Sequence, residues 1–207
     1  MEREETERTN RRSARRLREA KLKEAALIED IDWRNRPGLD KGVMLSLAGC
    51  DWIRQRHNII LVGPTGTGKT WLACALAHRA CLEGFSSYFT RVPRLFGELA
   101  LARSDGSYGK TLSRLAKTNV LVFDDWGSPL ADAERRDLLE IIEDRNGTAS
   151  TVITTQVPVD QWHEVIGDPT LADAILDRLI HCAHVINLSG ESLRKKRALV
   201  APVKQEG

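Results

Sequence analysis

The octapeptide at residues 63–70 constrains the fold of this chain more than any other stretch. It reads GPTGTGKT and matches the pattern G-x-x-x-x-G-K-[ST], between the short apolar run 59–62 and an apolar stretch with helical spacing. Glycines let successive backbone N–H groups curl toward a chain of phosphates, and the N-terminal end of the following helix adds positive charge. The sequence therefore predicts a phosphate-binding loop between a strand and a helix.

Every residue of this loop is a candidate for contact with a nucleotide. The lysine is expected to reach the β- and γ-phosphates, and the hydroxyl of the last threonine is expected to hold Mg²⁺. The candidate cofactor-binding residues are Gly63, Pro64, Thr65, Gly66, Thr67, Gly68, Lys69, Thr70 and the adjacent Trp71.

Two carboxylates, Asp124 and Asp125, follow the apolar run 120–123. The carboxyl ends of parallel strands meet at one edge of a sheet, so both acids are expected beside the loop. Asp124 is predicted to coordinate Mg²⁺ together with Thr70, and Asp125 is predicted to orient and polarise the attacking water. A pair of acids after a strand also occurs in ordinary loops, but the loop upstream favours the catalytic interpretation.

Polar residues at the end of the next apolar run are candidates to position that water. Gln156 is the first choice and Thr155 is the second. Arg178 lies on a later helical stretch that should face away from its own loop, so it is a candidate to stabilise the γ-phosphate of a neighbouring subunit. The alternative for Arg178 is a surface ion pair with Asp177 or Asp173.

Short apolar runs alternate with helical patterns along the chain, and this order predicts an α/β fold of three layers. Its centre is a five-stranded parallel sheet with helices on both faces. The expected strands are 59–62, 86–90, 120–123, 151–155 and 184–188, and the expected helices are 11–29, 39–54, 69–83, 93–102, 108–117, 132–146, 159–166 and 170–181.

Pro37 and Gly38 interrupt the chain between the first two expected helices. We therefore expect a basic helical extension and linker at 1–36, an ATPase core at 37–190 and a basic tail at 191–207. We expect no helical lid domain within residues 191–207.

The charge of the chain is unevenly distributed. The 207 residues include 31 Lys plus Arg against 29 Asp plus Glu, and 42% are hydrophobic, which fits one globular domain with a core. Residues 8–23 carry a net charge of +7, residues 191–207 carry +3, and residues 24–190 carry −5. The basic ends are either solvated tails or surfaces for a phosphate backbone. The absence of a run of 18 apolar residues and the charged N-terminus predict a cytoplasmic protein without a membrane span.

Five motifs together resemble the IstB-like transposition helper ATPases. They are GPTGTGKT, LVFDDWG at 121–127, ITTQVPVDQWHE at 153–164, AILDRL at 174–179 and GESLRKK at 190–196. This family belongs to the initiator and helicase-loader branch of AAA+ proteins, related to DnaC and DnaA, and the resemblance covers roughly residues 8–197. It implies a homo-oligomer with ATP and Mg²⁺ as cofactors that remodels target duplex DNA and activates a partner transposase.

The resemblance also implies roles for single residues. Gln156 or Thr155 takes the first sensor position, Arg178 becomes a trans-acting arginine finger, and Arg194 is the nearest equivalent of a second sensor. Asp125 stands where a glutamate is more usual and is one methylene shorter, which predicts slow hydrolysis that acts as a timer. The resemblance also implies that DNA stimulates this hydrolysis.

DNA binding of this kind needs basic groups that contact the phosphate backbone and tolerate different base sequences. The alternative for each basic residue is a solvated surface charge that makes no contact with DNA. The candidate DNA contacts are Arg91, Arg94, Arg103, Lys110, Arg114 and Lys117.

Trp33 lies before the expected core, and two roles are open for it. Its ring either stacks near the adenine of the nucleotide or anchors the linker.

Three other functions remain compatible with the sequence. A DnaC-like replicative helicase loader would prefer single-stranded DNA, and a P-loop small-molecule kinase would need an acceptor pocket. An ATP-binding scaffold would hydrolyse almost nothing. Competition between single-stranded and duplex DNA separates the loader from the transposition ATPase.

Overall fold

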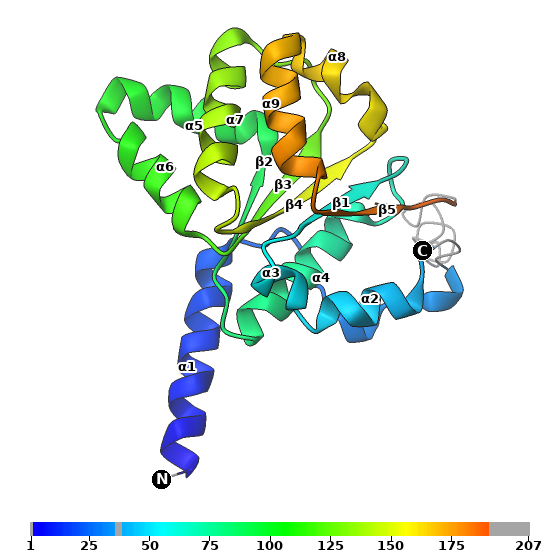
Figure 1. Cartoon of the computed structure of the whole chain (residues 1–207). Helices are drawn as coiled ribbons and strands as arrows, with labels where there is room; N and C mark the ends of the chain where they lie inside the picture. The colour runs from blue at the N-terminus through cyan, green and yellow to red at the C-terminus, as the bar shows by residue number, and fades with distance from the viewer. Residues whose placement is uncertain (1, 36–38, 191–207) are drawn as a thin grey trace, which may run out of the picture.

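The computed structural model describes residues 2–35 and 39–190. Within this part a parallel sheet confirms the predicted α/β class, with strand order β2-β3-β4-β1-β5 (Figure 1). The bounds of the strands are β1 (Asn58–Val62), β2 (Ser87–Arg91), β3 (Val120–Trp126), β4 (Ser150–Thr155) and β5 (Ala183–Asn187).

Successive residues of β1 point to opposite faces of the sheet and enter two cores. Ile59 and Leu61 belong to the core under α4, whereas Ile60 belongs to the core on the other face. Figure 1 shows the helices on the two sides of the sheet. One side carries α2 (Lys41–Ala48), α3 (Asp51–Arg54) and α4 (Lys69–Leu82), and the other carries α5 (Val92–Asp105), α6 (Tyr108–Lys117), α7 (Asp132–Arg145), α8 (Trp162–Ile166) and α9 (Pro169–Ile180). The site therefore lies on a sheet that is covered on both faces.

The N-terminal helix ends earlier than the sequence predicts. The helix α1 (Glu2–Ala20) stops at Lys21, whose φ of +51° is left-handed, and the prediction of a helix to residue 29 is wrong. The chain then continues to the short 3₁₀ turns η1 (Ile28–Asp30) and η2 (Trp33–Asn35). A left-handed residue costs about 1–3 kcal/mol. Burial of Ile28 and Ile31 in the core offsets this, at about 1.5–3 kcal/mol for each isoleucine.

Two other expected helices are divided. The stretch 39–54 breaks between α2 and α3 at Cys50, which has a φ of +61°. The stretch 159–166 begins as the 3₁₀ turn η3 (Val159–Gln161) before α8. These breaks are local, so they leave the predicted order of strands and helices intact.

Several smaller expectations concern single residues and the ends of the chain. Cys74 and Cys81 are buried on α4, where their thiols belong to the packed interior. Trp33 packs partly buried against the core under α4, which favours the anchoring role over stacking on adenine. Across residues 2–35 and 39–190, none of the helices has the length and apolar character needed to cross a bilayer. The expected boundary at Pro37 and the tail 191–207 lie outside the described residues.

Candidate functional site

The glycine-rich loop joins the end of β1 to the start of α4, as the motif requires. Gly66 and Gly68 have φ values of +87° and +89°, a left-handed conformation that glycine adopts without strain. At Gly63, a Cβ would lie 2.5 Å from the carbonyl oxygen of Leu188, so this position needs glycine for close approach to the chain after β5. Lys69 Nζ donates to the carbonyl oxygens of Gly63 at 2.6 Å and of Pro64 at 2.8 Å, which holds the ammonium group inside the loop.

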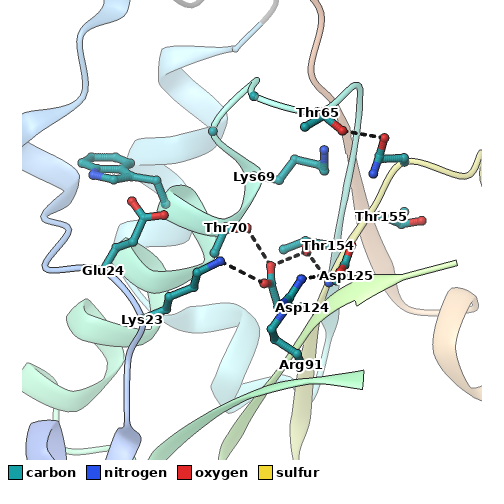
Figure 2. A pocket seen from close by; sticks show the side chains of 14 residues that line it. Lys23, Glu24, Thr65, Lys69, Thr70, Arg91, Asp124, Asp125, Thr154 and Thr155 are labelled. Atoms are coloured by element: carbon teal, nitrogen blue, oxygen red, sulfur yellow. Dashed lines mark hydrogen bonds and ion pairs between the residues drawn. The ribbon is translucent and has the colours of Figure 1, made fainter. Parts of the chain in front are cut away.

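Asp124 lies buried at the centre of the site, with 2% of its surface exposed. Its Oδ1 accepts one hydrogen bond from Thr70 Oγ1 and one from Thr154 Oγ1, each at 2.7 Å (Figure 2). The structure therefore brings together Thr70 and Asp124, the two predicted metal ligands. A threonine hydroxyl and a carboxylate are oxygen ligands that Mg²⁺ prefers, so these residues fit a nucleotide-bound magnesium ion.

Asp125 is turned away from its neighbour by an irregularity in the sheet. Phe123 pairs with Ile153 and Trp126 pairs with Thr155, so β3 has one residue more than β4 between the two pairs. Such a bulge re-aims a side chain. Asp125 takes a φ of +67° there, and its exposed carboxylate forms an ion pair with Arg91 at 2.7 Å.

The two candidates for positioning water have different surroundings. Gln156 Oε1 accepts a hydrogen bond from Thr65 Oγ1 at 2.7 Å, which places this amide beside the tip of the loop. Thr155 is 1% exposed, and its hydroxyl donates to the carbonyl oxygen of Trp126 at 2.8 Å. Both line the pocket, but the hydroxyl of Thr155 is engaged in joining β4 to β3.

Lys23 and Glu24 belong to the site although the sequence analysis missed them. They come from the irregular segment 21–27 that follows α1, and Lys23 Nζ lies 4.0 Å from Asp124 Oδ2 (Figure 2). This N-terminal segment closes one side of a pocket of about 280 Å³. The pocket is lined by Lys23, Glu24, Thr65, Gly66, Gly68, Lys69, Thr70, Trp71, Arg91, Asp124, Asp125, Thr154, Thr155 and Gln156.

Comparison with known proteins assigns this arrangement to a family. Residues 1–201 match the family model described as IstB-like ATP binding protein. The chain belongs to the IstB-like family. A putative insertion sequence ATP-binding protein of Sinorhizobium fredii is 54% identical to it over 95% of this chain and 81% of the relative. The putative ATP-binding protein of insertion sequence IS21 from Pseudomonas aeruginosa is 35% identical over 91% of this chain and 71% of the relative.

Solved structures are similar to this IstB-like chain in fold. A crystal structure of DnaI superposes with a TM-score of 0.68 at 23% identity and covers 81% of this chain and 90% of that chain. DnaA from Aquifex aeolicus, bound to AMPPCP, superposes with a TM-score of 0.65 at 13% identity and covers 89% of this chain and 59% of that chain. These likenesses show that the chain shares the P-loop NTPase fold of DnaI and DnaA.

Arg178 of the IstB-like chain lies away from its own loop. Its Nη2 is 3.1 Å from Glu143 Oε1 on α7, and its Nη1 donates to the carbonyl oxygen of Ala174 at 2.6 Å. The expected alternative partners, Asp173 and Asp177, are therefore replaced by an acid from another helix. Arg178 also lines a separate cavity of about 220 Å³ near the first residue of β1, Asn58.

The six basic candidates for DNA contact do not form one set. Arg91 lies in the nucleotide pocket, and Arg94 is bonded to Glu98 at 3.0 Å. Arg103 is bonded to the buried Asp137 and to Tyr108, so its position has a structural explanation. Burial, and then hydrogen bonds to the carboxylates of Asp137 and Glu140, raise the pKa of Tyr108, which keeps this hydroxyl protonated. The remaining three, Lys110, Arg114 and Lys117, are exposed on α6, whereas Arg194 lies outside the described residues.

Proposed function

We propose that this IstB-like protein is a Mg²⁺-dependent ATPase that assembles on duplex DNA during transposition. It remodels the target DNA and activates a partner transposase, and slow hydrolysis limits the lifetime of the assembly. The arrangement around Asp124 supports this proposal best, because it joins the phosphate-binding loop, through Thr70, to the strand that carries both acids.

The residues divide the chemistry among themselves. Bound Mg²⁺ would withdraw charge from the phosphates, and Thr70 and Asp124 are its ligands. Lys69 neutralises charge on the β- and γ-phosphates. Asp125 accepts a proton from the attacking water once its carboxylate leaves Arg91, and Gln156 beside the loop orients that water.

Family membership supports the biological setting of the proposal. Both relatives described above are named as ATP-binding proteins of insertion sequences. A transposition helper must hold DNA while its partner acts, so its affinity is expected to come from many weak phosphate contacts repeated around an oligomer.

The decisive experiment compares the parent protein with Lys69→Ala. With Mg²⁺ and ATP, the parent is expected to form oligomers on duplex DNA that sedimentation detects, and the variant is expected to stay unassembled. Oligomers formed equally by both proteins would overturn the nucleotide requirement. A competition arm with single-stranded DNA of equal length completes the test, because a strong preference for single strands would replace the transposition role with that of a helicase loader.

A further inference from the structure

A cavity of about 290 Å³, distinct from the one near Arg178, shares Lys23 and Arg91 with the nucleotide pocket, and we call it the second cavity. Its wall combines the segment after α1, the edge strand β2 and the start of α5. Besides Phe89 and Thr90, its lining consists of Lys21, Lys23, Tyr88, Arg91, Arg94 and Glu98. The acid among these residues, Glu98, is bonded to Arg94 at 3.0 Å, so the wall has an excess of positive charge.

One cation of this wall, Lys21, lies over an aromatic ring. Lys21 is the left-handed residue that ends α1, and its ammonium group lies 5.7 Å from the centre of the Tyr88 ring. Arg114 covers the same ring from α6, with its guanidinium carbon 4.6 Å from the centre. The ring is 7% exposed, so it acts as a fixed support for two cations rather than as a free stacking surface.

Two residues belong to both cavities. Lys23 and Arg91 line the nucleotide pocket and also the second cavity. In the nucleotide pocket they lie beside the two acids, Lys23 at 4.0 Å from Asp124 and Arg91 at 2.7 Å from Asp125 (Figure 2). An anion in the second cavity would attract both cations and leave both carboxylates free for the metal ion and the water.

We propose that the second cavity binds a backbone phosphate of duplex DNA, with Lys21 and Arg94 as the residues that determine its affinity. This inference rests on the proposed function, because it names where the DNA contacts the ATPase. Two observations favour DNA over a small free anion. The cations are spread over three elements, and the cavity lies at the end of α1, where Arg8, Arg11, Arg15 and Arg18 recur at helical spacing on one exposed face. A polyanion can contact both the helix face and the cavity.

The consequence for the reaction is a coupling between DNA and hydrolysis. A phosphate beside Lys21 and Arg94 also draws Lys23 from Asp124 and Arg91 from Asp125. DNA-bound subunits then have unpaired carboxylates at the nucleotide, whereas unbound subunits keep them neutralised. DNA is therefore expected to stimulate hydrolysis through this cavity.

The test uses the full chain and the double variant Lys21→Gln with Arg94→Gln. Glutamine keeps the length of the side chain and removes the charge, and neither residue belongs to the nucleotide pocket. The matched control, Arg34→Gln with Arg136→Gln, removes two exposed charges elsewhere on the molecule. Fluorescence anisotropy measures binding to a labelled duplex across a salt series, and phosphate release measures hydrolysis with and without DNA.

We expect the cavity variant to bind duplex more weakly, with a slope of log affinity against log salt concentration that is shallower by about 1.8, or about 0.9 for each lost contact. Its hydrolysis without DNA is unchanged, and its stimulation by DNA is lost. The inference would be overturned if Lys21→Gln with Arg94→Gln kept the salt dependence of the parent protein. It would also be overturned if the control variant lost as much duplex affinity and DNA stimulation. A parent protein that neither binds duplex nor hydrolyses ATP would instead overturn the proposed function.

Discussion

At the scale of single residues, Thr154 connects the two acids of the site. Its hydroxyl donates to Asp124 Oδ1 at 2.7 Å and accepts the backbone N–H of Asp125 at 3.1 Å. One side chain therefore orients the metal ligand and fixes the backbone from which the proposed base projects. Thr154 was not among the candidates predicted from the sequence, which were Thr155 and Gln156, because strand alternation alone does not show which threonine points at a carboxylate.

We predict that Thr154→Val lowers Mg²⁺-dependent hydrolysis about 10–100-fold, the usual effect of removing a residue that orients a metal ligand. Valine keeps the shape of the side chain but removes both hydrogen bonds. Steady-state phosphate release over a Mg²⁺ titration measures the effect. Thr118→Val is the matched control, because this buried threonine bonds to the Arg114 carbonyl away from the site. Equal activity of Thr154→Val and the control would contradict the assigned role.

The four cysteines provide a test of the fold that does not depend on activity. Cys182 is exposed, whereas Cys50, Cys74 and Cys81 are buried. Burial raises the pKa of the Cys50 thiol to about 11 and also raises the pKa of the other two buried thiols. At pH 8 their reactive thiolate forms are scarce and shielded.

We therefore predict that a thiol-reactive disulfide reagent modifies one cysteine per native chain rapidly and all four after denaturation. The absorbance of the released thiolate counts the modified groups. Cys182→Ser is expected to abolish the rapid phase. A second rapid thiol in the native protein would mean that one of the buried positions is open to solvent.

At the scale of elements, the sequence predicts the strands and helices whose apolar pattern is local. It does not predict the path of the chain where contacts between distant segments determine it. The runs at 59–62 and 120–123 are strands because every residue in them is buried on a doubly covered sheet. The path of residues 21–27 has no local apolar pattern, because it depends on the packing of Ala26 and Ile28 into the core under α4. The bulge that turns Asp125 depends on the register between two strands, which a single sequence does not reveal.

The buried Arg145 joins three elements at the amino ends of the strands. It is 2% exposed at the end of α7, and its guanidinium group donates to the carbonyl oxygens of Leu115, Thr118 and Ser150. Burial lowers its pKa to about 9, yet these carbonyl oxygens stabilise the cation. Arg145 thus fixes α7 against the end of α6 and the start of β4.

We predict that Arg145→Met lowers the free energy of unfolding, because each buried carbonyl left without a donor costs about 1–3 kcal/mol. Arg145→Lys is expected to lose less of this free energy, since an ammonium group can donate to some of the three carbonyl oxygens. Urea unfolding followed by circular dichroism measures both variants. Arg136→Met, at an exposed position on the same helix, is the control and should stay within about 0.5 kcal/mol of the parent. A similar loss of unfolding free energy in Arg136→Met would contradict the role of Arg145, because it would show that any such substitution on α7 destabilises the protein.

At the scale of the whole molecule, the nucleotide pocket and Arg178 lie at opposite ends of the sheet. The loop follows the last residue of β1, whereas Asn58, the first residue of β1, donates to the carbonyl oxygen of Arg178 at 3.3 Å. Five residues of strand span about 16 Å at about 3.3 Å per residue. We therefore predict that Arg178 acts on the γ-phosphate of another subunit rather than on that of its own, after assembly separates it from Glu143.

This geometry predicts complementation between two inactive variants. Arg178→Ala keeps a complete nucleotide pocket and lacks the candidate arginine finger. Lys69→Ala keeps Arg178 and lacks the lysine of the phosphate-binding loop. In a mixture on duplex DNA, some interfaces combine the intact pocket of the first variant with the intact Arg178 of the second. Phosphate release from the mixture is therefore expected to exceed the sum of the separate rates. A mixture no faster than that sum would mean that Arg178 acts within its own subunit or only stabilises the fold. In that case Glu143→Gln, which removes the ion-pair partner of Arg178 but keeps the arginine, would leave hydrolysis unchanged.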